Sequence, residues 1–135
     1  MVRLLLCLLA SALLGPFGGQ TTIRVTVQNI QVGQGSIAVA VYGSSGDFLK
    51  KPLAAQRRPA GQSNMDFTFD LPPGQYAIAA YQDLNDNGQL DAGMFNIPKE
   101  PYGFSNNYRP RFSAPHYEDC AIRVDSPMVC IIHLK

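Results

Sequence analysis

Oxygen-bearing side chains recur at every second position of the stretch YQDLNDNGQLDAG, residues 81–93. Asp83, Asn85 and Asn87 stand at positions 1, 3 and 5 of a candidate loop, and Gly88 stands at position 6. Oxygen ligands at this spacing, with a glycine where the chain turns sharply, are typical of loops that wrap around Ca²⁺. The predicted calcium ligands are the side chains of Asp83, Asn85, Asn87 and Asp91 and the backbone carbonyl of Gln89.

The same residue types also form turns without a metal. Asn and Asp side chains accept hydrogen bonds from nearby backbone N–H groups, and glycine adopts positive φ at little cost. In addition, Met94 stands where the helix-loop-helix calcium pattern has a bidentate glutamate. A further oxygen ligand would have to come from Glu100, Glu118 or Asp119. The sequence leaves both a calcium site and a metal-free turn open.

Period-two alternation of apolar and polar residues indicates the strands that position this loop. It predicts strands over residues 23–28, 36–43, 65–71 and 75–83, the last of which leads directly into Asp83. We expect the first two to pair as a hairpin, and residues 52–58 have the composition of a single helical turn. Several short strands joined by turns predict an all-β fold, an antiparallel two-sheet β-sandwich.

Residues 88–117 interrupt this pattern with several prolines and little alternation, which predicts one long ordered loop. Its expected anchors on the sandwich are Phe95, Ile97, Tyr102, Phe104, Tyr108 and Phe112. A candidate ligand-binding block within it consists of Tyr102, Phe104, Asn106, Asn107 and Tyr108. Aromatic rings and amides together suit stacking on a sugar or peptide, whereas the alternative is that they seal the loop onto the sandwich.

The first 20 residues have the composition of a secretory signal peptide. Arg3 precedes an apolar run over residues 4–14, which is too short to span a bilayer as a helix. The cleavage site is left open. Residues 21–135 are long enough for a single β-sandwich domain. We expect a secreted or periplasmic protein with no transmembrane segment in the mature chain.

The charge of the chain bears on its class of partner, and its cysteines bear on whether it forms a disulfide. With 11 basic and 10 acidic residues, the chain does not indicate binding to nucleic acid. The mature chain keeps Cys120 and Cys130, an even number that favours a disulfide in an exported protein. Strand-like segments around both cysteines flank the turn residues DSP, which predicts a hairpin bridged by that disulfide. Two free buried thiols are the alternative.

Three segments together carry a family resemblance: LPPGQYAIAAYQDLNDNGQLD, GMFNIPKEPYGFSNN and RPRFSAPHYEDCAIRV. They resemble domain-of-unknown-function family 2141 of exported bacterial proteins, over nearly the whole mature chain. The resemblance implies a secreted or periplasmic β-sandwich that is prealbumin-like or immunoglobulin-like in style. It implies no established reaction.

These observations support two hypotheses of function. The first is an exported, non-enzymatic β-sandwich that acts as a binding or structural module of the cell envelope, is stabilised by Ca²⁺ and recognises an envelope protein, peptide or glycan. The alternative is an envelope hydrolase that acts on a small or glycan substrate through His116 and the nearby acids Glu118 and Asp119. Because no serine or cysteine nucleophile has a recognisable local signature, we assign no catalytic residue.

Overall fold

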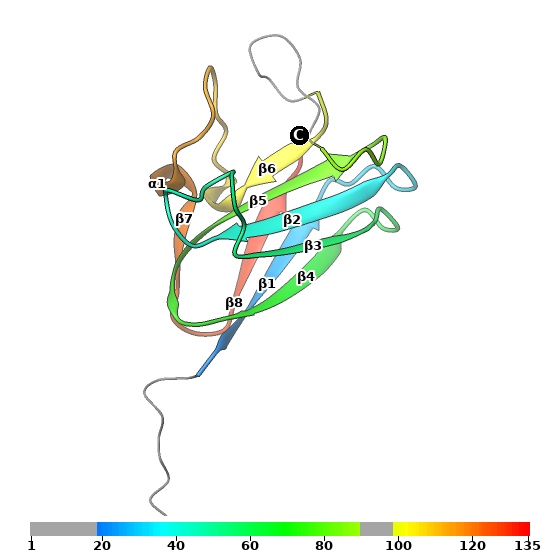
Figure 1. Cartoon of the computed structure of the whole chain (residues 1–135). Helices are drawn as coiled ribbons and strands as arrows, with labels where there is room; N and C mark the ends of the chain where they lie inside the picture. The colour runs from blue at the N-terminus through cyan, green and yellow to red at the C-terminus, as the bar shows by residue number, and fades with distance from the viewer. Residues whose placement is uncertain (1–18, 90–98) are drawn as a thin grey trace, which may run out of the picture.

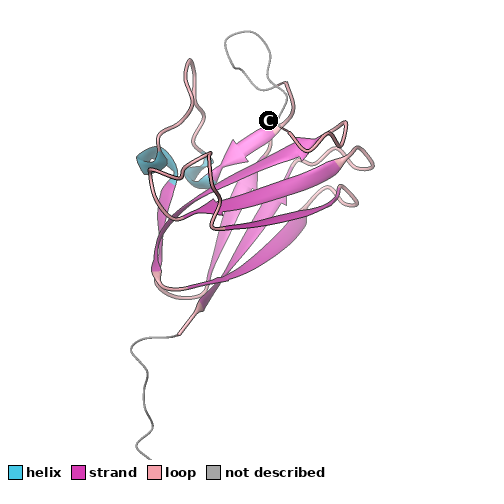
Figure 2. Ribbon diagram, viewed as in Figure 1, coloured by secondary structure: helices cyan, strands magenta, loops and turns pink. Residues whose placement is uncertain are grey.

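The computed structural model describes residues 19–89 and 99–135, in which eight strands form two sheets packed face to face (Figure 2). The predicted all-β sandwich is therefore confirmed. The strands are β1 (Thr21–Gln28), β2 (Ser36–Tyr42), β3 (Ala54–Pro59), β4 (Met65–Leu71), β5 (Gly74–Asp83), β6 (Tyr102–Phe104), β7 (Ala121–Val124) and β8 (Met128–His133). The helical segments described are one 3-10 turn, η2 (Ser105–Asn107), and one short helix, α1 (Tyr117–Cys120). No helix within the described ranges is long and apolar enough to cross a membrane. The predicted signal peptide lies largely outside these ranges.

The smaller sheet, called sheet A, has the strand order β4-β1-β8, and the larger, sheet B, has the order β3-β2-β5-β6 (Figure 1). β7 pairs with the beginning of β5 and so also belongs to sheet B. All pairs are antiparallel except β1 with β8, which run parallel. The first and last strands of the fold are therefore neighbours.

The predicted hairpin between residues 23–28 and 36–43 is wrong, because β1 and β2 lie in different sheets. The buried side chain of Gln82 fixes the crossing between them. Its amide donates to the carbonyls of Gln31 and Gln34 at 2.7 Å each, and its oxygen accepts the Gln31 N–H at 2.9 Å. Residues 29–35 are thus held as an arch from one sheet to the other.

The helical turn expected over residues 52–58 is also wrong. Residues 54–59 instead form β3, which pairs with β2 from Ala54 opposite Val41 to Pro59 opposite Ser36. The long loop is shorter than expected, because residues 102–104 within it form β6 on the edge of β5. Of its expected anchors, Phe95 and Ile97 lie outside the described residues, and Phe112 is 94% exposed.

The core lies between the sheets and consists of the apolar side chains that alternate along each strand. Burying a side chain such as Val, Ile or Phe contributes roughly 1.5 to 3 kcal/mol, so the alternation itself selects which face of each strand turns inward. The fully buried members include Ile23, Val25, Val27, Ile37, Val39, Val41, Phe67, Ile78, Val124, Ile132 and Leu134.

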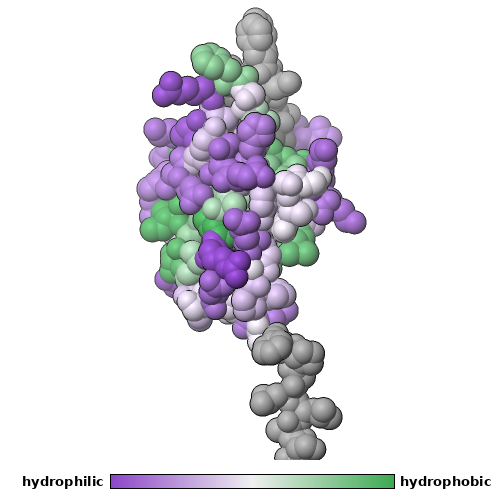
Figure 3. All heavy atoms as spheres, turned by 90° about the vertical axis from the view of Figure 1, so that its left-hand side faces the viewer, coloured by the Kyte–Doolittle hydropathy of each residue, from purple (hydrophilic) through white to green (hydrophobic). Residues whose placement is uncertain are grey.

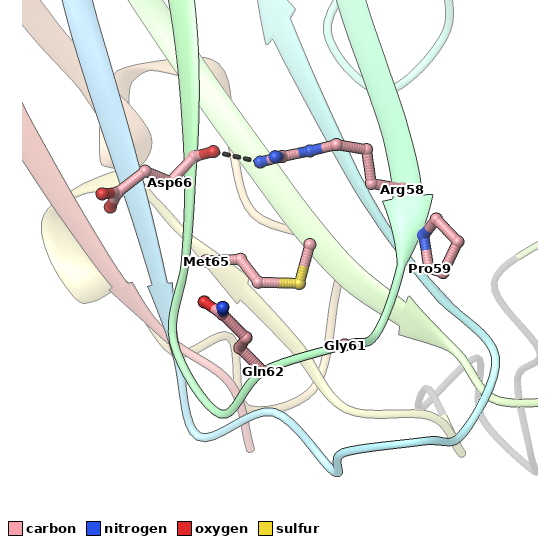
Figure 4. A pocket seen from close by; sticks show the side chains of 6 residues that line it. All are labelled: Arg58, Pro59, Gly61, Gln62, Met65 and Asp66. Atoms are coloured by element: carbon pink, nitrogen blue, oxygen red, sulfur yellow. Dashed lines mark hydrogen bonds between the residues drawn. The ribbon is translucent and has the colours of Figure 1, made fainter.

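Side chains of β3 close the side of the sandwich where the edges of the two sheets meet (Figure 4). Gln56 donates its amide to the Thr68 carbonyl at 2.6 Å, and Arg58 donates to the Asp66 carbonyl. The Arg58 guanidinium also lies 4.2 Å from the centre of the Phe67 ring. These contacts occupy edge carbonyls of β4 that would otherwise be free to pair with another chain.

The opposite side is closed by main-chain contacts around β6. Tyr102 and Lys135 exchange two backbone hydrogen bonds of 3.1 Å. Gly103 makes this approach possible, because a Cβ there would lie 2.5 Å from Cγ2 of Ile132 and 2.8 Å from the His133 carbonyl oxygen. Any larger residue would force β6 away from the end of β8.

The predicted hairpin around the two cysteines is wrong. β7 pairs with β5 in sheet B, whereas β8 pairs with β1 in sheet A, so the DSP turn connects the two sheets. Cys120 and Cys130 are both free and buried in this structure, in separate hydrophobic clusters. Burial raises the pKa of Cys130 to about 11. Burial and the nearby Asp119 raise the pKa of Cys120 to about 12.

This arrangement predicts two unreactive thiols in place of a disulfide. In a full-length chain carrying Cys7→Ser, a thiol reagent near pH 8 should modify the native protein slowly, because the reactive thiolate is scarce and buried. Denaturation without reductant should then expose two thiols per chain. Finding none after denaturation would contradict the structure and restore the bridge between Cys120 and Cys130.

Candidate functional site

The loop that follows β5 is braced by hydrogen bonds from its own backbone. The Asp83 carboxylate accepts the N–H groups of Asn87 at 3.2 Å and Gly88 at 2.7 Å. The Asn85 side chain accepts the Asn87 N–H at 3.3 Å, and the Asn87 side chain accepts the Gln89 N–H at 2.9 Å. The turn chemistry predicted for these residues is thus observed.

Arg57 on β3, which is separated from β5 by β2, places a positive charge on this loop. Its Nη2 lies 2.6 Å from a carboxylate oxygen of Asp83 and 3.1 Å from one of Asp86. Asp86 also accepts the Ser36 hydroxyl at 2.7 Å. The contacts tie the ends of β2, β3 and β5 together through side chains.

The Asp83 side chain is fully buried, and its environment favours the ionised form. Burial by itself raises the pKa of Asp83. The hydrogen bonds from Arg57, Gly88 and Asn87, together with the Arg57 charge, lower the pKa by more than burial raises it. The pKa therefore lies below the ordinary value of 3.8. A carboxylate that stays charged without contact with water depends on all of these donors.

Three residues of the candidate ligand-binding block, Phe104, Asn106 and Asn107, make contacts that hold the loop on the sandwich. Phe104 is 7% exposed, and its ring centre lies 6.5 Å from that of Phe48. Asn106 donates to the carbonyls of Asp119 and Ala121 at 3.3 and 3.0 Å, and Asn107 accepts the His133 N–H at 3.2 Å. Both asparagines adopt positive φ, which this residue type tolerates. They hold η2 in place, as the sealing interpretation predicts.

A groove of about 930 Å³ lies on the outer face of sheet B, the face turned away from the core. Its floor follows from the strand register. Ala55, Ala40 and Ala79 stand side by side on β3, β2 and β5, and Phe104 on β6 ends this row. The adjacent row consists of Arg57, Ala38, Tyr81 and Tyr102 in the same strand order. Because four of these eight positions are alanine, the sheet surface is hollow between taller side chains.

Two loops form the walls of the groove. Residues 43–53 contribute Leu49 and Pro52, and residues 110–115 form the other wall. Phe48 pins the first loop to the sheet through edge-on ring contacts with Tyr42 at 5.4 Å and Tyr117 at 6.0 Å. Figure 3 views the side that carries this loop and α1, where apolar side chains form small patches separated by polar ones. The groove is therefore a candidate binding surface.

The family model described as "Uncharacterized protein conserved in bacteria", domain-of-unknown-function family 2141, matches residues 25–131. The chain belongs to this family. The match spans every strand from within β1 to within β8, so it includes both the braced loop and the groove of this family 2141 member. No curated protein and no solved structure matches the chain.

The residues proposed for a hydrolase are not organised around a reactive group. His116 is exposed at the start of α1, and the Asp119 carboxylate accepts the His116 backbone N–H at 3.0 Å. Glu118 is exposed on the same short helix, and the nearby Cys120 thiol is buried. These contacts give Asp119 a role in capping the helix.

Calcium binding stays a prediction, because Asp91 lies outside the described residues. Of the additional ligands considered, Glu100 is at the loop, where its carboxylate accepts the Leu84 N–H at 2.6 Å. Glu118 and Asp119 are on α1, which lies near the start of β5, whereas the loop follows its end (Figure 1). Within residues 19–89 and 99–135, no three His, Cys, Asp or Glu side chains are grouped as metal ligands.

The groove as a whole was not predicted from the sequence, although Tyr102 and Phe104 of the predicted ligand-binding block line it and a further signal was present. The outward positions of β2 and β5 hold Ala38, Ala40, Ala77 and Ala79, where a strand facing water usually carries polar residues. Small apolar residues on the outer face of two adjacent strands indicate a surface that something else covers. Arg57 was also missed as the partner of Asp83, because the pairing of β3 with β2 was not expected.

Asp83→Asn tests the buried carboxylate. Because the pKa of Asp83 is lower in the folded state, its charge stabilises the fold above the ordinary pKa, and this stabilisation is lost as the pH falls through the folded-state value. The variant should lose about 1.5 to 3 kcal/mol of unfolding free energy at neutral pH. Urea unfolding from about pH 6 to pH 2 should then show a shallower decline than in the wild type.

The matched control is Asp125→Asn, which removes an exposed ion pair with Arg123 of 2.9 Å. It should change the unfolding free energy by less than about 1 kcal/mol. If the unfolding free energies of wild type and Asp83→Asn fall in parallel across this pH range, the lowered pKa of Asp83 in the folded state is contradicted.

Arg57→Gln tests whether the loop binds calcium. The guanidinium neutralises Asp83 and Asp86 and so competes with a metal for the same oxygens. Adding calcium to chelator-treated protein should therefore raise the Tm of the variant more than that of the wild type. A hundredfold excess over Kd corresponds to about 2.7 kcal/mol. Magnesium should do less, because it keeps its water and requires a tighter octahedron. Unchanged Tm values in both proteins would reject the calcium site.

Proposed function

We propose that this chain is an exported, non-enzymatic binding module of the bacterial cell envelope that holds an apolar ligand in the groove on sheet B. The groove carries the proposal, since its volume of about 930 Å³ lies in the range of small-molecule binding sites. Export, to the periplasm or beyond the cell, rests on the signal-peptide composition of residues 1–20. Calcium bound at the loop after β5 would brace one end of the same sheet.

The chemistry of the floor favours an apolar ligand over the glycan or peptide expected from the sequence. β2 is paired with both β3 and β5, and β5 is paired with β2 and β6, so their backbone groups are already hydrogen-bonded where the floor lies. Four of the eight side chains above them are the methyl groups of Ala38, Ala40, Ala55 and Ala79, and the polar ones, Arg57, Tyr81 and Tyr102, lie in a single row. The alanine part of the floor offers no partner for sugar hydroxyls or for the N–H and C=O groups of a peptide, whose burial without partners is unfavourable.

The groove is also held open by packing contacts around its rim. Phe48, Phe104, Tyr42 and Tyr117 form an aromatic cluster that supports one wall and one end of the floor. Arg109 supports the other wall, since it donates to the Tyr102 carbonyl at 2.8 Å and stacks 4.3 Å from the Tyr102 ring centre. A preformed site of this kind binds without a large ordering cost.

The hydrolase alternative has weaker support. A general base must be able to reach a nucleophile or a water next to the substrate. His116 is exposed, its neighbour Asp119 is engaged in capping, and burial keeps Cys120 protonated with a raised pKa. We therefore favour binding without chemistry.

Binding of a neutral apolar dye, N-phenyl-1-naphthylamine, tests the proposal. Its fluorescence should rise on titration with the wild-type chain. Ala40→Phe places a ring in the middle of the floor and should weaken binding at least about tenfold, which corresponds to about 1.4 kcal/mol. Thr68→Phe is the control, because it adds the same ring to the exposed outer face of β4.

Three outcomes would reject the groove as the site. They are no dye binding by the wild type, equal binding by the wild type and Ala40→Phe, and equal losses in Ala40→Phe and Thr68→Phe. Thermal melts of both variants establish that a loss of binding does not reflect loss of the fold.

A further inference from the structure

We infer that the ligand of this groove is an amphipathic organic anion, a long-chain carboxylate with its apolar body on the alanine floor and its charged end at Arg111. The inference rests on the proposed function and adds the chemical class of the ligand. It follows from the distribution of charge around the groove.

The lining of the groove is one-sided in charge. Arg57 and Arg111 both contribute to it, whereas no Asp or Glu among the described residues does. A lining with cations, aromatic rings and methyl groups but no carboxylates favours an anion and disfavours a cation. A neutral apolar ligand would cover the floor but would form no ion pair with the arginines of the lining.

The two arginines differ in what already surrounds them. Arg57 lies within 4 Å of two carboxylates, those of Asp83 and Asp86, so its charge is more than balanced. Arg111 is exposed, and no carboxylate in the described parts of the chain lies within 4 Å of it. Arg111 is therefore the cation that a ligand can reach and pair with.

Neighbouring contacts position Arg111 at the groove. Two residues earlier, Arg109 is fixed to β6 by its hydrogen bond to the Tyr102 carbonyl and its stacking on the Tyr102 ring. Pro110 and Pro115 lie at the two ends of this wall and restrict its backbone. The guanidinium is thus carried by a segment whose base is anchored and whose conformational freedom is reduced.

The loop of residues 43–53, which forms the other wall, also carries basic residues. Lys50 and Lys51 are exposed and lie between Leu49 and Pro52, which line the groove. Leu49 has a φ of +59°, an unfavourable conformation for a bulky residue, and it is 42% exposed. The loop thus keeps an apolar side chain at the groove, with two exposed lysines next to it in the sequence.

A series of ligands with one chain and three headgroups tests the inference. Dodecanoate, dodecanol and dodecyltrimethylammonium, each below its micelle concentration, are competed against the neutral dye on the full-length protein. Dodecanoate should displace the dye at a concentration about fivefold lower than dodecanol, as expected for one partly exposed ion pair, and the ammonium should be the weakest. Raising the salt concentration should reduce this preference.

Variants assign the preference to one residue. Arg111→Gln should remove most of the advantage of dodecanoate over dodecanol and leave the affinity for dodecanol unchanged, and Arg111→Lys should retain part of that advantage. Arg123→Gln removes an exposed arginine on β7 that does not line the groove, so it should behave as the wild type.

The outcomes separate this inference from the proposed function. If none of the three compounds displaces the dye and the dye itself does not bind, the apolar groove fails as a site. If all three displace it equally, the groove binds apolar molecules and the inference of an anionic ligand is overturned. If Arg111→Gln weakens dodecanol as much as dodecanoate, Arg111 only shapes the wall, and its role at the headgroup is overturned.

Discussion

The buried carboxylate of Asp83 is the constraint on which this end of the sandwich depends. A charge without contact with water must be compensated by hydrogen bonds, and here Arg57 and two backbone N–H groups supply them. Meeting this demand fixes the loop after β5 and aligns β3 beside β2. The close approach extends to Gly35, where a Cβ would lie 1.8 Å from the Asp83 carbonyl oxygen. Because Arg57 also lines the groove, the same requirement fixes one edge of the proposed binding surface.

The alternation of apolar and polar residues predicted the strands well, because the buried face of a strand requires an apolar residue at every second position. Residues 65–71, with Phe67 and Phe69 inward, illustrate this. The same pattern does not specify partners. Which strand lies beside β1 depends on arches such as the one held by Gln82, and a buried amide in a strand gives no sign of what it binds. β3 was missed since consecutive arginines, Arg57 and Arg58, hide the alternation of a strand whose faces are both partly exposed.

The candidate sites show the same division between local and non-local information. The turn formed by Asp83, Asn85 and Asn87 is local, so residue types alone predict its hydrogen bonds. The groove is non-local, because Ala40, Ala55 and Ala79 become neighbours only through the register of three strands. A row of alanines facing water leaves apolar area exposed, and covering that area is favourable by roughly 25 cal/mol per Å². Covering this row with another molecule is therefore favourable even when no new hydrogen bond forms.

The parallel pairing of β1 with β8 has a consequence for how the chain reaches this fold. Asn29, just after β1, donates to the carbonyl of Leu134, which is 105 residues further along the chain. Contacts of such high sequence separation slow folding, because the ends of a long segment must meet before any pairing energy is gained. Until β8 arrives, β1 has an open edge able to pair with other chains. Kinetic competition between closure of this edge and self-association therefore bears on how much of the newly made protein reaches the native state.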